Sequence, residues 1–541
     1  MIQQHGSPLP YLDQWDAEAA GLYVPYFNHQ LSPAVFFRPN NEHRIVFTQI
    51  YNLALLVLNG QWDGQLQMVV NAIIHCACLA AFGLLMANLL GPQNWPWIWT
   101  LLTASLALPF AWENILSGFQ SQFYFLLIAS LLTIWLLGTE QEGSRKWWFG
   151  VAAGCLALFT MATGFMAAAA VACIALFDIA RGRRQLQQQW RTLLVCSLIV
   201  IAGVLLKAHV DRHDILKADS VEAFLRTFGR NLSWPLMGYT WLAGLNLLPM
   251  IVLVLRCAHS QEELGAAERV ILGIGFWAGI QALAMAYARG GTGYFPAPRY
   301  MDILSFLMIA NGLSIILLLD RYGAGLRPAP LWRLAFALWV AGVAWGLHSV
   351  SAMAYQKGNL PFWDRVQDAR LVNARAFMAT DDAHVLMNRG WCEIPFDDVP
   401  ELVSLMRTPS IRTNLPACVR EPLNIQPANR EGFVANGWLL PVADAPTERS
   451  WGSYSATSAR KTKMFESEPV KASALPYLEI AVAGNLGAKG TSLELVDVAS
   501  GAAIQVRPAV IPGARWVNVR VKAPAGPFKV VARDETETRW F

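Results

Sequence analysis

The sequence is poor in charged residues. Only 15% of its 541 residues are Asp, Glu, Lys or Arg, whereas soluble proteins average about 25%. Hydrophobic residues make up 55%, and the net charge of +4 is spread along the chain without a basic stripe. The composition therefore points to a membrane protein and argues against nucleic acid as a partner.

Motifs for metal and nucleotide binding are also missing. The eight cysteines form no CxxC pair and no zinc spacing, and the chain has no P-loop and no GxGxxG after a strand. We therefore expect no nucleotide site, and the sequence indicates neither a cofactor nor a divalent metal. Cys392 and Cys418, in the polar C-terminal part, are candidates for a disulfide in an oxidising compartment.

Apolar residues gather in long runs between Trp62 and Met353. A membrane-spanning helix needs about 17–25 such residues. The stretch 147–180 is too long for one span and is broken at Thr163-Gly164, so we predict two helices there. Single spans are predicted at 66–90, 95–112, 121–138, 191–208, 236–256, 268–287, 300–319 and 331–354, which makes about ten in all.

The basic short connections set the expected orientation. They lie at 144–148, 181–191 and 320–333, all on one side of the predicted spans, which should be cytoplasmic. The outer side then receives 1–47, 112–120, 209–235, 288–300 and the C-terminal region. The apolar stretch 45–60 is short, so we predict a helix at the outer interface. Because the chain begins in an outer loop, we also expect a transmembrane helix upstream of Met1.

The C-terminal part differs in pattern. After a mixed region at 355–431, the segments YLEIAVAG, TSLELVDV, AAIQVRPAV, RWVNVRVKA and FKVVARDE alternate or run apolar between turn residues, as short antiparallel strands do. They predict a β-sandwich at 432–541 that serves as a sugar-binding module or as a structural lid. The expected parts of the chain are thus 1–62, 63–354, 355–431 and 432–541.

Four polar clusters fall on the predicted outer side, where ionisable groups are costly and therefore candidates for function. In the first, YLDQWDAE, Asp13 and Asp16 are three residues apart and would share a helix face, with Glu18 nearby. The other clusters are Glu42, His43 and Arg44 in NEHRI, then Glu113, Asn114 and Gln120 in WENILSGFQ, and finally Arg289, Arg299 and Tyr300.

Each cluster also has a purely structural explanation. A single acid such as Asp13 is more often a helix cap or a solvated loop residue. Glu42 and Arg44 could form a surface ion pair of little energetic value, and His43 could be a packed interfacial histidine. Glu113 could cap a helix, and the arginines could snorkel. The functional interpretation rests on all four clusters sharing one membrane face.

That combination suits attack by a hydroxyl on a lipid-linked sugar. The reaction needs a carboxylate base near the acceptor and cations on the departing phosphate, which arginine holds with a fork of donors. We expect Asp13 or Asp16 to be the base, with Glu42 as a second candidate acid. The expected substrate-binding residues are His43, Arg44, Glu113, Asn114, Gln120, Arg289, Arg299 and Tyr300, the last three at the phosphate.

The motifs DQWD, NEHRI, WENILSGFQ and PRY, in a chain with this order of outer loops and spans, resemble a bacterial branch of the membrane-embedded C-type (GT-C fold) glycosyltransferases. The resemblance covers roughly residues 1–355. It implies an inverting transferase of a bacterial inner membrane, with a periplasmic C-terminal domain. It also implies a polyprenyl-phosphate sugar as donor and a glycan, lipid or protein as acceptor. In that class the first outer loop normally carries the catalytic acid, which falls best on Asp13 or Asp16.

Two other kinds of protein fit parts of the pattern. A transporter or flippase of lipid-linked sugar would also have many spans, although such proteins often show internal repeats and mid-membrane polar sites. The chain shows no clear repeat, and its polar residues gather at one surface. A non-catalytic sugar-binding envelope assembly protein would instead use the β-sandwich as its working part.

Overall fold

The computed structural model describes residues 1–236, 239–292, 296–322, 329–355, 359–416, 419–420, 423, 425–438, 450–454, 462–471, 477–537 and 539–541. These residues form two compact units. One consists of Met1–Arg370 and Arg389–Leu405, and the other of Leu371–Asn388 and Met406–Phe541. The predicted connecting region 355–431 is therefore divided between the two units.

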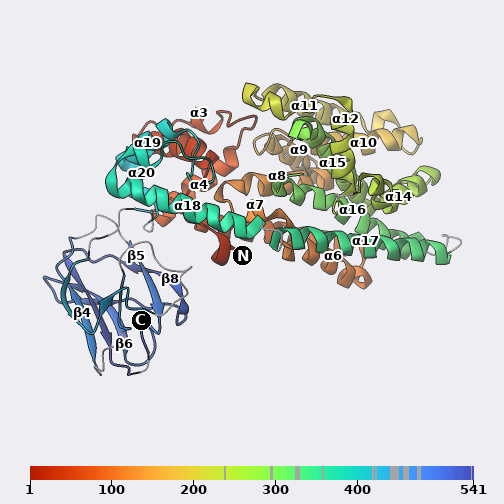
Figure 1. Ribbon diagram of the computed structural model, residues 1–541. Helices are drawn as coiled ribbons and strands as arrows, with labels where there is room; N and C mark the ends of the chain where they lie inside the picture. Colours follow the sequence, from red (N-terminus) through yellow and green to blue (C-terminus); the bar gives the residue numbers. More distant parts are fainter. Residues whose placement is uncertain are drawn as a thin grey trace. The chain divides into compact units, whose positions relative to one another are not determined.

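The first unit is helical (Figure 1). Its long helices are α4 (Val46–Asn59), α5 (Gly64–Leu90), α6 (Trp95–Ala107), α8 (Ser121–Leu132), α9 (Arg145–Ala157), α10 (Met166–Ala180), α11 (Trp190–Leu206), α12 (Val221–Ser233), α14 (Leu248–His259), α15 (Ala266–Arg289), α16 (Pro298–Tyr322), α17 (Ala329–Tyr355) and α18 (Asn359–Thr380). Short helical turns join them: α1 (Ile2–His5), the π-helix η1 (Gln14–Tyr23), α2 (Val24–Phe27), α3 (Pro33–Phe36), η2 (Pro92–Asn94), η3 (Pro109–Ala111), α7 (Trp112–Ile115), η4 (Gly118–Gln120), η5 (Thr133–Leu137), η6 (Leu186–Gln188), η7 (Asp211–Leu216), η8 (Thr240–Leu242), α13 (Ala243–Asn246) and η9 (Gly290–Thr292).

Five helical stretches are long and apolar enough to cross a membrane, as expected for a membrane protein. A sixth is possible where Thr240–Asn246 and Leu248–His259 meet at a bend of 46°. Val46–Asn59, Met166–Ala180 and Trp190–Leu206 are apolar but shorter. The five stretches are Gly64–Leu90, Gly118–Leu137, Ala266–Arg289, Pro298–Arg321 and, apart from 356–358, Leu331–Thr380.

Local sequence explains where several of these helices begin and end. Asp63 caps α5 by accepting hydrogen bonds from the backbone N–H groups of Gln65 and Leu66. The predicted break in 147–180 lies between α9 and α10, which are joined by residues 158–165. A Cβ atom on Gly164 would lie 1.9 Å from the carbonyl oxygen of Ala157, so only glycine allows this turn.

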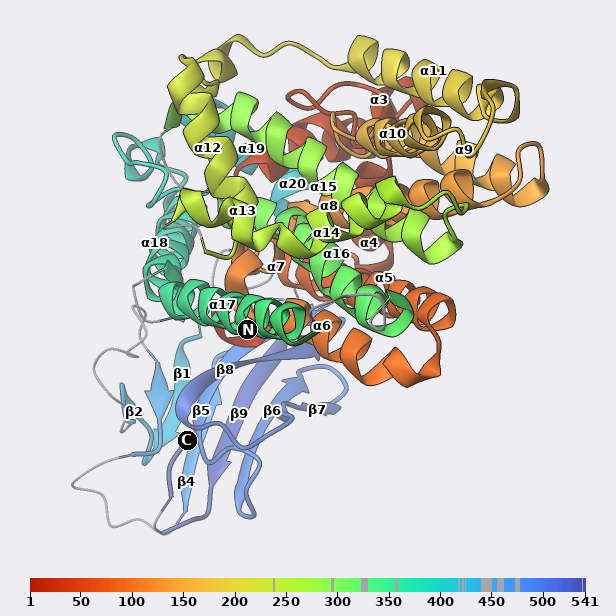
Figure 2. The same ribbon diagram turned by 90° about the vertical axis from the view of Figure 1, so that its right-hand side faces the viewer.

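The ends of the long helices form two groups. At one end, Arg321 near the end of α16 pairs with Glu268 at the start of α15 at 2.8 Å. Arg183, just after α10, donates to the carbonyl of Ser260, just after α14, at 2.8 Å. The opposite ends of α15 and α16, which pack along each other (Figure 2), carry Arg289 and Arg299. The ends of α15 and α16 therefore form two opposite groups, one with the Arg321–Glu268 pair and one with Arg289 and Arg299.

The second unit contains the strand-rich C-terminal region and three short helical elements, α19 (Val399–Arg407, shared with the first unit), α20 (Pro409–Asn414) and η10 (Ala383–Val385). Its main sheet has five strands in the order β1-β4-β9-β6-β7, and β2-β3 and β5-β8 form two-stranded sheets (Figure 2). Side chains of the five-stranded sheet and of β5 and β8 share one hydrophobic core, which includes Phe465, Leu495, Val519 and Phe528. The strands are β1 (Pro427–Glu431), β2 (Val434–Ala435), β3 (Trp451–Gly452), β4 (Lys463–Ser467), β5 (Tyr477–Gly484), β6 (Thr491–Asp497), β7 (Ala503–Gln505), β8 (Gly513–Lys522) and β9 (Phe528–Asp534).

Candidate functional site

A cavity of about 1060 Å³ lies in the first unit. Its walls come from segments far apart in the sequence, at 11–16, 40–43, 112–123, 212–216, 359–363 and 391–401, together with the facing ends of α15 and α16. All four polar clusters of the sequence contribute to it. The predicted site residues that line the cavity are Asp13, Asp16, Glu42, His43, Glu113, Gln120, Arg289, Arg299 and Tyr300.

Asp13 and Asp16 lie at the start of η1 on the cavity wall. Burial raises the pKa of the Asp13 carboxyl, and the charge of Asp16 adds to this effect, while Arg212 and Arg299 oppose it. A carboxylate with a raised pKa is a stronger base than an ordinary one. Of the two predicted candidates, Asp13 therefore has the surroundings better suited to accepting a proton.

Glu18, the third acid of the same segment, is turned away from the cavity into a buried cluster. Burial raises its pKa to about 7, although the hydrogen bonds that it accepts oppose the rise. Among the described residues no cation contacts this carboxyl, and the groups that donate hydrogen bonds to it are all neutral. Its two oxygens accept hydrogen bonds at 2.7–3.3 Å from Gln14, Tyr23, Asn52, Trp62 and Gln67. Glu18 thus ties η1 to α4 and α5.

The NEHRI segment forms a tight turn. Asn40 and His43 exchange both backbone hydrogen bonds, and Asn41 between them has a φ of +48°, a value that asparagine tolerates better than most residues. The turn presents Glu42 to the 209–217 loop, where His213 Nδ1 lies 2.6 Å from Glu42 Oε1. The suggested ion pair between Glu42 and Arg44 is therefore replaced by a pair between Glu42 and His213.

His43 and Arg44 have different partners. His43 Nδ1 accepts a hydrogen bond from the backbone N–H of Ala162 at 3.1 Å, which leaves the proton on Nε2. Burial lowers the pKa of His43 to about 4, aided by the charge of Arg289, so the ring is neutral at ordinary pH. Arg44 donates to the carbonyls of Phe37 and Leu206 and contributes to a second, much smaller pocket. Its contacts are thus with the backbone.

The end of α15 and the start of α16 form the basic wall of the cavity, and Glu113 of α7 lies beside it. Arg299 Nη1 lies 3.1 Å from Glu113 Oε2, and the Arg299 guanidinium lies 5.2 Å from the centre of the Tyr300 ring. Arg289 also interacts with Tyr300, so both arginines act on this tyrosine. Asn114 is buried behind this wall and donates to the carbonyl of Arg299 and to Asp302, each at 2.8 Å. Asn114 therefore fixes the start of α16.

Several lining residues were not predicted from the sequence. Arg212 and His213 come from the predicted outer loop 209–235, and Arg212 donates to Asn41 Oδ1 at 2.6 Å. The segment 389–401 lies in the mixed region and looked like part of a soluble connection. From it and from α18 come Phe362, Trp363, Trp391, Phe396, Asp397, Asp398 and Glu401.

These additional residues form a wall of acids and aromatic rings. Burial raises the pKa of Glu401, and the negative charges of Asp16 and Asp398 raise it further, so the three acids of this wall interact. Phe362 and Trp391, which are 41% and 50% exposed, make an edge-to-face pair with ring centres 6.3 Å apart. The cavity therefore has arginines at one wall and carboxylates with exposed aromatic rings at another.

Arg370 holds the aromatic wall from behind. Its buried guanidinium lies 3.8 Å from the centre of the Tyr11 ring and 5.2 Å from that of Trp363. Two of its nitrogens donate to the carbonyl of Trp391, at 2.7 and 3.0 Å. A backbone hydrogen bond from Leu12 to the carbonyl of Pro395, at 2.7 Å, fastens the same segment to the N-terminal loop.

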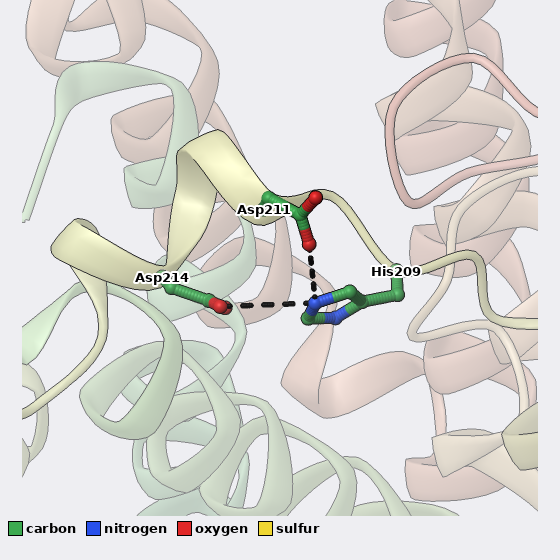
Figure 3. A group of neighbouring side chains, drawn as sticks. All are labelled: His209, Asp211 and Asp214. Carbon is green, nitrogen blue, oxygen red and sulfur yellow. Dashed lines mark ion pairs between the residues drawn. The ribbon is translucent and has the colours of Figure 1, made fainter.

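One group of side chains has the composition of a metal site. His209, Asp211 and Asp214 place three possible ligand atoms within 4.8 Å of one another (Figure 3). All three residues are exposed, and Asp214 pairs with Lys217 at 2.6 Å, so its charge already has a partner. The predicted disulfide partner Cys418 lies outside the described residues, and Cys392 is partly buried in the first unit.

The chain matches no protein-family model and no curated protein sequence. Any assignment of function therefore rests on the site itself. Its walls carry arginines, carboxylates and exposed aromatic rings, and the Asp13 carboxyl among them has a raised pKa.

Proposed function

We propose that the protein is a glycosyltransferase of a bacterial inner membrane, which moves a sugar from a polyprenyl-phosphate donor to an acceptor on the periplasmic side. One observation carries the proposal. Acids and arginines from four separate polar segments line a single cavity at one end of a set of apolar helices. A lipid-linked phosphate could enter there from the bilayer, and the acceptor could enter from water.

Different walls of the cavity suit different parts of this reaction. The phosphate of the donor would lie against Arg289 and Arg299, whose guanidinium groups can each donate more than one hydrogen bond to phosphate oxygens. Asp13 would take the proton from the attacking hydroxyl, since it lies near Arg299 and has a raised pKa. Tyr300, on which both arginines act, would help to hold the phosphate.

The acceptor would occupy the wall of acids and aromatic rings. Carboxylates accept hydrogen bonds from hydroxyl groups, and exposed aromatic faces pack against the apolar faces of sugars. Trp391 and Phe362 supply such faces, and Asp398 and Glu401 supply the carboxylates. The attacking hydroxyl would then point toward Asp13.

The proposal includes about ten membrane crossings with the cavity on the outer side. The apolar runs of the sequence are the basis for this count, and five helical stretches, with a sixth possible at a bent pair, are long and apolar enough to cross a membrane. The crossings would be α5, α6, α8 with η5, α9, α10, α11, α13 with α14, α15, α16 and α17. The strand-rich C-terminal region would be periplasmic, and α4 would lie at the outer interface.

The test uses full-length protein in proteoliposomes with a panel of polyprenyl-phosphate hexoses and pentoses, and it measures the sugar transferred to added envelope glycans and lipids. Asp13→Asn should lower the rate at least about a hundredfold, the usual size of a lost general base. Glu140→Gln, in an exposed ion pair with Lys146, is the matched control and should keep the wild-type rate.

The outcomes separate the rival functions. Wild-type rates in Asp13→Asn and in Asp16→Asn would contradict the assignment of the base. Movement of the labelled lipid-linked sugar across the membrane without any glycosylated product would identify a flippase. If deletion of 432–541 removed the cellular phenotype while both aspartate variants kept it, the protein would be a sugar-binding assembly factor.

A further inference from the structure

Two loops meet at the cavity through a pair of side-chain contacts. Glu42 Oε1 lies 2.6 Å from His213 Nδ1, and beside it Asn41 Oδ1 accepts a hydrogen bond from Arg212 at 2.6 Å. The side chains of Glu42 and His213 are only 14% and 18% exposed, yet both line the cavity. The turn at 40–43 and the short helix η7 therefore hold a carboxylate–imidazole pair at the wall.

The geometry of this pair fixes which atom of His213 can react. Since Nδ1 faces the Glu42 carboxylate, the nitrogen left for a ligand is Nε2. Burial raises the pKa of Glu42, but the hydrogen bond from His213 and the other groups around the carboxyl outweigh burial, so the pKa is lowered overall. Glu42 is consequently ionised at neutral pH, and its carboxylate faces Nδ1 of His213.

The other charged groups around His213 define its setting. Asp13 from the N-terminal loop and His43 from the 40–43 turn both feel the charge of His213, and Arg212 precedes it in η7. His43 cannot supply a proton there, because its pKa of about 4 keeps it neutral. Of these two histidines, His213 is the one that is paired with a carboxylate at the cavity wall.

We propose that His213 is the general acid of the transfer reaction, with Glu42 as the residue that positions it. This inference rests on the proposed function. The acceptor oxygen forms a bond to the anomeric carbon of the sugar while the bond from that carbon to the phosphate oxygen breaks. The bonding electrons pass to the phosphate oxygen, which receives the proton of His213 Nε2. Asp13 takes the proton of the acceptor hydroxyl.

The proton balance closes without another reactant. After transfer, Asp13 carries one proton more and His213 one fewer, and the leaving group is a polyprenyl phosphate monoanion. A proton then passes from Asp13 to His213, which lies close enough for the two charges to interact. The second ionisation of a phosphate monoester falls near pH 6, so an imidazolium is a well-matched acid for it.

The experiment measures binding of the leaving group and needs no turnover. The probe is farnesyl phosphate, with farnesol as its uncharged control, and dissociation constants are determined in detergent at pH 6 to 9. The proteins are wild type, His213→Gln and Glu42→Gln. His209→Gln is the matched control, since His209 is an exposed histidine of the same loop that pairs with Asp211 at 2.9 Å.

A proton shared between His213 and the phosphate gives a charge-assisted hydrogen bond, so His213→Gln should weaken farnesyl phosphate binding about tenfold at pH 6. At pH 9, above the range in which imidazole side chains ordinarily bind a second proton, the variant and the wild type should bind alike. In Glu42→Gln the protonated ring lacks its carboxylate partner. The tighter binding of farnesyl phosphate should therefore be confined to lower pH than in the wild type. His209→Gln should follow the wild-type curve throughout.

Each result decides the question. If His213→Gln weakens binding by the same factor at every pH, His213 only shapes the loop, and the proposal is wrong. If Glu42→Gln leaves the pH dependence unchanged, Glu42 does not position the acid. Should His213→Gln fail to fold, the Glu42→Gln curve alone still tests the pair. Equal binding of farnesyl phosphate and farnesol by the wild-type protein would instead contradict the proposed function, because the cavity would then not recognise the phosphate.

Discussion

Arg299 and Glu113 form an ion pair across the starts of α16 and α7, with Nη1 and Oε2 3.1 Å apart. The arginine is 40% exposed and the glutamate 22%, so both still reach the cavity. Glu113 accordingly has two opposing effects on an anion in the cavity. It orients the arginine that would bind the anion, and it cancels part of the arginine's charge.

Two substitutions at Glu113 separate these effects. Glu113→Gln keeps an oxygen for Arg299 but removes the negative charge, so farnesyl phosphate should bind about threefold to tenfold more tightly. Glu113→Ala removes both, and the freed arginine should bind the phosphate less well than it does in Glu113→Gln. Calorimetric titration of the two variants measures the difference. Identical affinities in wild type and Glu113→Gln would place Arg299 outside the phosphate site.

The buried Glu18 should make the stability of the protein depend on pH. Its pKa is raised from 4.5 to about 7 in the folded chain, so the unfolded chain ionises first as the pH rises. Stability should therefore fall between about pH 4.5 and pH 7 and then level off. Since one pKa step is worth about 1.4 kcal/mol, the contribution of Glu18 is at most about 3 kcal/mol.

Glu18→Gln cannot ionise and should lack this part of the pH dependence. Melting temperatures of wild type and Glu18→Gln, measured in detergent from pH 4 to pH 8, give the contribution by difference. A difference that stays constant over the whole range would mean that the pKa of Glu18 is not raised. Glu18→Ala should be far less stable at every pH, because it leaves buried donors without an acceptor.

The stability of the protein should depend on Arg370 even when the substitution is conservative. Arg370→Lys loses the two hydrogen bonds to the carbonyl of Trp391 and the planar contact with Tyr11. We expect a loss of about 2–4 kcal/mol in unfolding free energy. Arg365→Lys, an exposed position of the same helix, is the control and should be neutral. Equal stability of both variants would argue that the aromatic wall does not depend on Arg370.

The buried ion pairs at the other ends of the helices give a further test. Asp178 lies between Arg269, at 2.5 Å, and Arg183, at 3.4 Å, and all three side chains are almost fully buried. Asp178→Asn leaves two buried cations without their carboxylate and should cost about 3–5 kcal/mol. Glu140→Gln removes an exposed pair and should change stability by less than about 1 kcal/mol. Melting in detergent compares the two.

The apolar pattern predicted the helices well because a long apolar run in a chain of this kind forms a helix whatever its neighbours are. The runs at 268–287, 300–319 and 331–354 correspond to α15, α16 and α17, each within a few residues. In the C-terminal region, YLEIAVAG coincides with β5. The predicted run 236–256 is instead bent between α13 and α14, a break that hydropathy alone does not reveal.

The cavity was predictable only in part. Asp13 and Arg299 were predicted on the same side of the membrane, which suggested one site, and both line the cavity. The pairing of Glu42 with His213 depends on a loop contact 171 residues away along the chain, which no local pattern encodes. The wall at 391–401 was missed for a similar reason, since a short polar segment gives no periodic signal for what it packs against.

The distance along the chain between the cavity walls has a consequence for biosynthesis. The acids at 11–16 leave the ribosome early, whereas Trp391 and Glu401 follow only after the last apolar helix. A chain still being inserted therefore holds its early carboxylates and arginines without the wall that would present an acceptor. Such a nascent chain has an incomplete cavity until the segment at 391–401 has been made.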